Sequence, residues 1–222
     1  ERDVWRLTAG LYIDAGEGEN AARAAGLYIS GKDDAFGLFL RARAAFLLGH
    51  WQAARLDAQR ALSLGTLARG DEVLAHNLLA RVSCSMGEVE ESLREERAAF
   101  ESAETLEDKA SSWSNYLFAL HYVEREPQFM LDAARRYGEL FKGVPRMKRA
   151  PKRRGKIRVG YISPDFTFHI VALFSFAFFT HFDKSRFEVF GYSLAGENAM
   201  AAELSSHATA WRYVGGGTAA EI

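Results

Sequence analysis

The sequence predicts an array of paired α-helices followed by an α/β unit with a parallel sheet. Two observations predict the array: small and apolar residues recur at helical spacing up to about residue 102, and glycine turns interrupt them at near-regular intervals. A third observation, the order strand, loop, helix, strand within 156–193, predicts the parallel sheet. We therefore expect repeat helices in 1–105, further helices in 106–145, a basic linker in 146–155 and the α/β unit in 156–222.

The composition is that of an ordinary folded protein, with 48% hydrophobic and 26% charged residues among 222. The net charge of −1 favours neither nucleic acid nor a membrane surface as a partner, so we expect neither. The single cysteine, Cys84, excludes an internal disulfide and a multi-cysteine metal site, and we expect no metal and no cofactor. Nothing resembles a signal peptide, which makes a reducing, cytoplasmic location the default expectation.

Three blocks repeat the order helix, glycine turn, helix. They are WRLTAGLYIDAGEGENAARAAGLY, LFLRARAAFLLGHWQAARLDAQRAL and LAHNLLARVSCSMGEVEESLREERAAF, with turn glycines at Gly16, Gly49 and Gly87. The periods of 33 and 38 residues lie near the length of a tetratricopeptide repeat, which is about 34 residues. The longer second period indicates a small insertion around 65–71. The pattern predicts a tetratricopeptide-type α-solenoid.

Small residues occupy the positions where the helices of such a repeat cross closely. They are Ala9, Ala42 and Ala80 on the first helices, and Ala21, Ala54 and Ser92 on the second helices. Most large apolar side chains are then expected in the core of the stacked array. The groove along the first helices is expected to hold an extended peptide or a partner protein.

Residues 104–143 continue as helix, and Pro127 begins a new helix within them. We expect these two helices to cap the open end of the array and to dock it onto the α/β unit. The run from Arg146 to Lys156 is strongly basic and contains Pro151 and Gly155. Such a run is more typical of a solvated linker than of a site for nucleic acid or anionic lipid.

Residues 156–193 have the pattern of a βαβ unit, the beginning of a partial Rossmann-like domain. A β-rich run ends at Pro164, the apolar block 170–179 is expected to form a buried helix, and 187–192 alternate as a second strand. The block is too short to cross a bilayer, which requires about 20 apolar residues. Without later strands, the edge of the strand 187–192 would pair with another chain, which favours a homo-oligomer.

Ligands of open parallel sheets bind beyond the carboxyl ends of the strands, which places the candidate site at 163–169. His169 stands near the start of the apolar helix, where partial positive charge and free amide groups favour anions such as phosphate. A neutral histidine there can accept a proton or hold a hydroxyl group, and Asp165 can fix its tautomer or cap the helix. A purely structural capping role is the alternative.

Three separated pieces of the sequence follow one another in a characteristic order. They are SNYLFALHY with ARRYGELF, then RVGYISPDF with a histidine four residues after the aspartate, then DKSRFEVFGYS. In this order they resemble bacterial O-linked N-acetylglucosamine transferase-like proteins, from about residue 114 to the end of the sequence. That family joins tetratricopeptide repeats to a two-domain glycosyltransferase of the GT-B type.

The resemblance implies a protein glycosyltransferase that uses a UDP-sugar as donor. It implies that His169 lies in the cleft beside the sugar and the acceptor hydroxyl, either as general base or as a positioning group. Ser163, Asp165 and Thr167, on the same loop, become candidates for substrate binding. One feature of the animal enzymes is absent, because the asparagines that line their repeat groove correspond here to Leu7, Leu40 and Leu78.

Helical spacing already in the first residues and a helix-like pattern in the last five lead us to expect a piece of a longer protein. In the GT-B type the second domain holds most of the nucleotide, so we expect this chain alone to be inactive. The alternative is a repeat-based adaptor for protein–protein interaction with a structural α/β portion. An α/β signalling domain of the flavodoxin type is the weakest hypothesis, because Asp165 stands without a second acidic residue at the end of the first strand.

Overall fold

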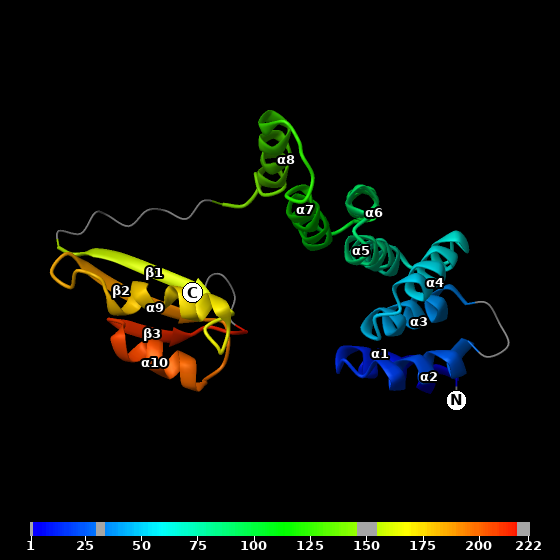
Figure 1. Cartoon of the computed structure of the whole chain (residues 1–222), viewed down its shortest axis with the longest axis horizontal. Coiled ribbons are helices and arrows are strands. Elements are labelled where there is room, and N and C mark those ends of the chain that lie inside the picture. The colour runs from blue at the N-terminus through cyan, green and yellow to red at the C-terminus, as the bar shows by residue number, and fades with distance from the viewer. Residues whose placement is uncertain (1, 30–33, 146–154, 217–222) are drawn as a thin grey trace. The chain divides into compact units, whose positions relative to one another are not determined.

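The computed structural model describes residues 2–29, 34–145 and 155–216 (Figure 1). The chain forms two compact units, Glu1–Arg146 and Met147–Ile222. The first is helical and the second contains a small parallel sheet. Two sequence-based predictions, the basic linker 146–155 except for its last residue and a helix beginning at 218, lie outside the described residues.

Three helix pairs build the first 102 residues, as the repeats predict. They are α1 (Arg2–Asp14) with α2 (Gly18–Ile29), α3 (Ala35–Leu47) with α4 (Trp51–Ser63), and α5 (Arg69–Ser85) with α6 (Val89–Ser102). Each helix packs against the next in chain order, which is the arrangement of an α-solenoid (Figure 1). The tetratricopeptide-type repeat fold is therefore confirmed.

The turn glycines lie where the repeat pattern places them. Gly16, Gly49 and Gly87 have φ angles of 76°, 73° and 79°, in the left-handed region that side chains other than glycine rarely adopt. After each of them, the next backbone amide reaches back to a carbonyl in the last turn of the preceding helix, for example His50 N to Ala45 O at 2.9 Å. This Schellman arrangement ends the first helix and reverses the chain into the second one.

The six small residues expected at the helix crossings are all buried, with at most 3% of each side chain exposed. The predicted insertion appears as a longer helix, because α5 has 17 residues whereas α1 and α3 each have 13. Leu40 and Leu78, at two of the asparagine-ladder positions, are buried in the array, so they do not line an open groove.

Two more helices follow, α7 (Leu106–Leu120) and α8 (Pro127–Glu139), and α8 begins at the predicted proline. Leu93 of α6 shares a core with Trp113 and Leu120 of α7 and Ala133 of α8. The indole N–H of Trp113 donates to the Ala133 carbonyl at 2.8 Å, which ties α8 to α7. These contacts cover the last repeat, as capping helices should.

The second unit is a three-stranded parallel sheet with two crossover helices. Its elements are β1 (Ile157–Ser163), α9 (Ile170–Thr180), β2 (Phe187–Ser193), α10 (Ala199–His207) and β3 (Ala210–Tyr213). The strands lie in the order β1-β2-β3, with Ser163 beside Ser193 and Ser193 beside Tyr213. Phe179 of α9 and Leu204 of α10 share one core with Val189 of β2, so both helices cover the same face of the sheet.

The expectation of an open edge at the strand 187–192 is wrong. β3 pairs with β2 along that edge, which places β2 in the middle of the sheet. The strand was missed because Ala210–Tyr213 is only four residues long, too short for a period of two to stand out. The argument for a homo-oligomer from that edge therefore falls.

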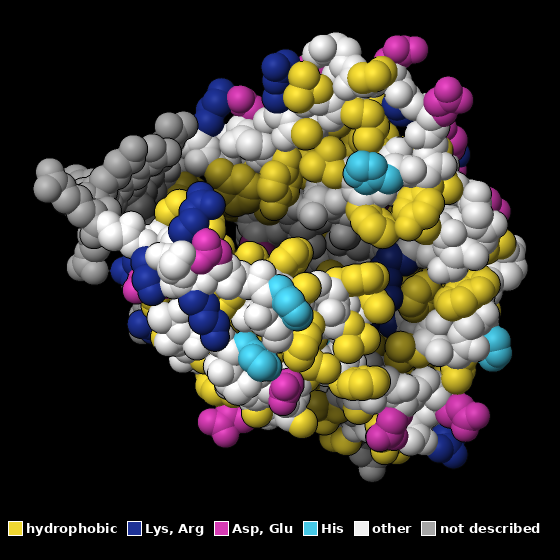
Figure 2. All heavy atoms as spheres, turned by 60° about the vertical axis from the view of Figure 1, so that its left-hand side comes forward, with side chains coloured by type: hydrophobic (Ala, Val, Ile, Leu, Met, Phe, Trp, Pro, Cys, Tyr) yellow, Lys and Arg dark blue, Asp and Glu magenta, His cyan; other side chains and the backbone are white. Residues whose placement is uncertain are grey.

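The expectation that 170–179 forms a buried helix is also wrong in part. The helix forms, but it buries only Ala172, Ser175 and Phe179. Six large apolar side chains on and before it are exposed, namely Phe168, Ile170, Val171, Leu173, Phe174 and Phe178. A helix that covers one face of a sheet buries one stripe, and here the sequence is apolar on the other faces as well. Figure 2 shows many hydrophobic side chains on the face turned forward, with charged side chains mainly toward its margin.

Candidate active site

The candidate site is the loop that connects β1 to α9, at the carboxyl end of the first strand. Ser163 ends β1, and its carbonyl accepts a hydrogen bond from Leu194 N at 3.0 Å. The Ser163 hydroxyl accepts a hydrogen bond from the backbone amide of Asp165 at 3.0 Å. This hydroxyl thereby shapes the turn at Pro164, which is a structural role for one of the residues predicted to bind substrate.

Phe166 fixes this loop to the core. Its side chain is buried, edge-on to Phe179 and tilted against Trp211 at centroid distances of 5.7 and 5.1 Å. Asn198 holds the same residue from the next loop, because its Nδ2 donates to the Phe166 carbonyl at 3.0 Å. The loop is therefore anchored by packing and by a hydrogen bond across the carboxyl edge of the sheet.

His169 is the N-cap of α9. Its Nδ1 accepts a hydrogen bond from Val171 N at 3.2 Å, and its own backbone amide donates to the Thr167 carbonyl at 2.7 Å. Since Nδ1 is an acceptor, the neutral ring carries its proton on Nε2. The side chain is exposed, so Nε2–H is a hydrogen-bond donor on a ring whose other nitrogen is already engaged.

Asp165 does neither of the two things that its position in the sequence allows. Among the described residues no hydrogen bond joins its carboxylate to His169, and the cap of α9 is His169 itself. The tautomer of the histidine is fixed by the Val171 amide instead. Asp165 and Thr167 are half-buried in the same loop.

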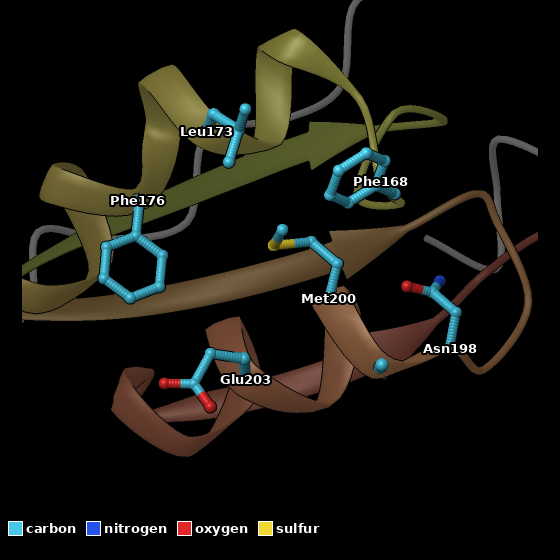
Figure 3. A pocket seen from close by; sticks show the side chains of 7 residues that line it. Phe168, Leu173, Phe176, Asn198, Met200 and Glu203 are labelled. Atoms are coloured by element: carbon cyan, nitrogen blue, oxygen red, sulfur yellow. The ribbon is translucent and has the colours of Figure 1, made fainter.

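A cavity of about 610 Å³ opens between α9 and α10, next to this loop (Figure 3). Phe168, Leu173, Phe176 and Met200 give it mainly apolar walls, and Asn198 and Glu203 are its polar side chains. Of the loop 163–169 only Phe168 lines the cavity, with 91% of its surface exposed. The four predicted site residues therefore lie beside the cavity and do not line it.

Asn198 was missed by the sequence interpretation. It is the N-cap of α10, where its Oδ1 accepts from Ala201 N at 3.0 Å. An asparagine directly before an Ala-rich helix is an N-cap signature, so the cap itself could have been predicted. Its second bond, to the Phe166 carbonyl, joins residues 32 positions apart and has no local signal.

The third strand also ends at this edge. Val214 N donates to the Ser193 carbonyl at 2.7 Å, and a Cβ atom at Gly215 would lie 2.3 Å from the Leu194 carbonyl oxygen. Only glycine permits this close approach of two loops. Gly215 and Gly216 form a turn.

The motif DKSRFEVFGYS has a structural basis at the opposite, amino end of β2. The Asp183 carboxylate accepts hydrogen bonds from the Ser185 amide at 2.8 Å and the Ser185 hydroxyl at 2.6 Å. These bonds hold the pKa of the Asp183 carboxyl below its ordinary value. The conformation they fix is the turn that leads from α9 into β2, and it is far along the strand from the candidate site.

The described residues contain no group of three or more His, Cys, Asp or Glu side chains placed to hold a metal ion. None of the described helices combines the length and the apolar character that a membrane crossing requires.

The two units together define a class of protein in which a helical repeat array is joined to a parallel α/β unit. Within that class, the chain is similar to a solved mutant of the O-GlcNAc transferase of Thermobaculum terrenum, with a TM-score of 0.67 and 25% sequence identity. The similarity covers 99% of this chain and 42% of that one, so this chain spans less than half of the length of that transferase.

A solved structure of MamA is also similar, with 18% identity, a TM-score of 0.49, and coverage of 63% of this chain and 75% of that one. No protein-family model and no curated protein matches the sequence.

Proposed function

We propose that this chain is the repeat array and the first α/β unit of a UDP-sugar-dependent protein glycosyltransferase of the O-GlcNAc transferase-like kind. The observation that carries the proposal is the similarity to the Thermobaculum terrenum enzyme, which extends over both units at 25% identity. The three sequence motifs that resemble this family support it independently.

Within the proposal, the loop 163–169 contributes to the cleft in which sugar and acceptor meet. Glycosyl transfer requires an acceptor aligned with the anomeric carbon and stabilisation of the charge on the leaving diphosphate. His169 suits the role of a donor, because the bond from Val171 N to Nδ1 leaves the proton on Nε2. The Nε2–H group would orient the acceptor hydroxyl or an oxygen of the sugar or phosphate. For the ring to act as a base, its Nδ1 would have to accept the proton, and the cap bond to Nδ1 would first have to break.

The donor is a substrate in this proposal, and no cofactor is implied. In the GT-B type the nucleotide is held mainly by a second domain, so this chain alone should neither transfer sugar nor bind UDP tightly. Calorimetric titration of the chain with UDP tests this expectation. Binding in the micromolar range would show that the nucleotide site has been assigned to the wrong domain.

A repeat-based adaptor is the second candidate. One observation favours it, namely that the cavity beside the loop is lined by none of the four predicted site residues. Transfer from a radiolabelled UDP-sugar by the complete natural protein separates the two candidates. Transfer that is lost when His169 is replaced would favour the enzyme, and an absence of transfer to any protein acceptor would favour the adaptor.

A further inference from the structure

A cavity of about 280 Å³ lies where the last repeat helix meets the two capping helices, and the proposed transfer site does not use it. Its lining side chains come from α6, α7 and α8, and none comes from the first helices α1, α3 and α5, along which the expected groove runs. Those used in the argument are Arg97 of α6, Trp113 of α7, and Phe129, Asp132 and Arg136 of α8. Small-molecule sites usually occupy about 300–1,000 Å³, so this cavity suits one charged group on a short stem.

Arg136 is positioned in this cavity by aromatic rings. Its guanidinium carbon lies 4.5 Å from the centroid of the Trp113 ring and 5.0 Å from the centroid of the Phe100 ring. Trp113 is itself fixed, because it is buried and its indole N–H donates to the Ala133 carbonyl at 2.8 Å. Stacking engages the face of a guanidinium and leaves the N–H groups at its edge available to an acceptor.

Arg97 brings a second positive charge to the same cavity. Neither Arg97 nor Arg136 makes an ion pair or a side-chain hydrogen bond with another described residue. By contrast Arg94, one turn earlier on α6, pairs with Glu91. Two guanidinium groups without anionic partners repel each other across a cavity of this size, and an anion bound to both would remove that repulsion.

Asp132 is the one acidic residue among the described side chains that line the cavity, and its charge is balanced on its own helix. Its Oδ1 atom accepts a hydrogen bond from Gln128 Nε2 at 2.8 Å and another from Arg135 at 3.3 Å. Because Arg135 lies outside the cavity and compensates Asp132, the two lining arginines leave the cavity with two uncompensated positive charges.

This number of charges selects the ligand. A carboxylate would neutralise only one guanidinium, whereas a phosphate monoester carries about 1.5 to 2 negative charges near pH 7 and has three strong acceptor oxygens. The planar N–H fork of arginine matches pairs of phosphate oxygens, and arginine clusters commonly recognise phosphorylated side chains. Phe129, with 44% of its surface exposed, provides apolar surface for the stem that carries the phosphate.

We propose that this cavity binds the dianion of a phosphate monoester through Arg97 and Arg136, with Arg136 positioned by the Trp113 and Phe100 rings. The ester is a phosphorylated serine or threonine of a partner protein or a small organic phosphate, and the recognised group is the same in both. The proposal goes beyond the proposed function and does not rest on it, because no residue of the loop 163–169 takes part.

Calorimetric titration of the whole chain with two pairs of probes tests the chemistry of the site. The first pair is methyl phosphate and acetate. The second pair is two octapeptides with capped ends and otherwise uncharged side chains, which carry phosphoserine or glutamate at one central position. In at least one pair the phosphate should bind at least about tenfold more tightly than the carboxylate, the effect of a single charge-assisted hydrogen bond. A smaller preference in both pairs, or no binding of either phosphate, overturns the proposal.

Three variants locate the effect. Arg136→Gln and Arg97→Gln each remove one of the two charges, and each should weaken the binding of the phosphate probe by at least about tenfold. Arg94→Gln makes the same change of net charge on α6 at an arginine that lies outside the cavity, and it should retain the wild-type affinity to within about twofold. Circular dichroism checks that the variants are folded. Arg97→Gln, at an exposed side chain, carries the test alone if Arg136→Gln does not fold. Wild-type affinity in Arg97→Gln overturns the proposal.

The same titrations distinguish the two sources of the phosphate. A phosphoserine peptide that binds at least about tenfold more tightly than methyl phosphate identifies a phosphorylated protein, because the peptide then adds contacts of its own. A smaller advantage, or weaker binding of the peptide, identifies a small organic phosphate. None of these measurements depends on sugar transfer, so they leave the proposed enzymatic function to be tested separately.

Discussion

Replacing His169 in two different ways separates its capping role from a role in transfer. The Nδ1 atom caps α9 through Val171 N, and Nε2–H is the atom available to a substrate. Asparagine is among the best N-cap residues, and its side-chain oxygen can replace Nδ1 as the acceptor. His169→Asn therefore keeps the cap and removes Nε2–H, whereas His169→Ala removes both.

The expected stabilities follow from the cap alone. An N-cap replaced by alanine costs about 1 kcal/mol. A loss of that size lowers the melting temperature of a domain of the size of the second unit by about 4–8 °C. His169→Ala should show this decrease in calorimetry, and His169→Asn should melt within about 2 °C of the wild type, since the cap bond is retained.

The expected activities follow from the loss of the Nε2–H donor in both variants. Loss of one donor to the reacting groups costs about 10²-fold in turnover or more, so both variants of the complete natural protein should fall by that factor. Turnover is measured with a labelled UDP-sugar below the melting temperature of each variant. Full activity of His169→Asn beside reduced activity of His169→Ala would refute the reasoning and leave His169 as a cap only.

Three further predictions concern the array and the exposed helix. The pKa of Glu96 is raised by burial from 4.5 in the unfolded chain to about 8, so the folded state holds the proton more tightly and the free energy of unfolding should fall as pH rises between these values. The groups that face this carboxyl are Arg81, Glu95 and Asn115. Urea denaturation at several pH values across that range should show that the free energy of unfolding of Glu96→Gln depends less on pH than that of the wild type. The same pH dependence in both proteins would contradict the raised pKa of Glu96. Gly87→Ala should destabilise the array by about 1–2 kcal/mol, because Gly87 has a left-handed backbone conformation. Gly26→Ala, in open space within α2, should instead stabilise the array by about 0.5–1 kcal/mol. A similar effect of both substitutions in denaturation would refute the argument that the turn requires glycine at position 87. Phe174→Lys, at a side chain that is 75% exposed, should change the stability by less than about 0.5 kcal/mol and raise the solubility. Phe179→Ala, in the core, should cost about 3–5 kcal/mol of stability. Equal losses for the two variants in thermal melts would show that the outer face of α9 is packed.

Much of the fold follows from local rules that apply directly to the residue types and spacings in the sequence. The turns at Gly16, Gly49 and Gly87 require a positive φ, and glycine adopts it without steric cost. The crossings of the helix pairs require small side chains, and alanine or serine occurs at each of them. Because these requirements repeat along the chain, they reinforce one another, and the solenoid could be predicted without knowledge of any contact.

The sequence by itself also determined the position of the candidate site, because Pro164 ends β1 and parallel sheets present their ligands at that end. Only the tertiary structure decided what the side chains there do. That Nδ1 of His169 caps its own helix and leaves Nε2–H available depends on the rotamer of one ring and on the amide of Val171.

The same holds for partners that are distant in the sequence. The bond from Asn198 to Phe166, the pairing of β3 with β2 and the exposed outer face of α9 all depend on packing between separate elements. The burial of Glu96 is of the same kind, since helices from two repeats and the first capping helix surround its side chain. Residue type and spacing fix the local backbone, whereas desolvation and long-range hydrogen bonds exist only once the chain has folded.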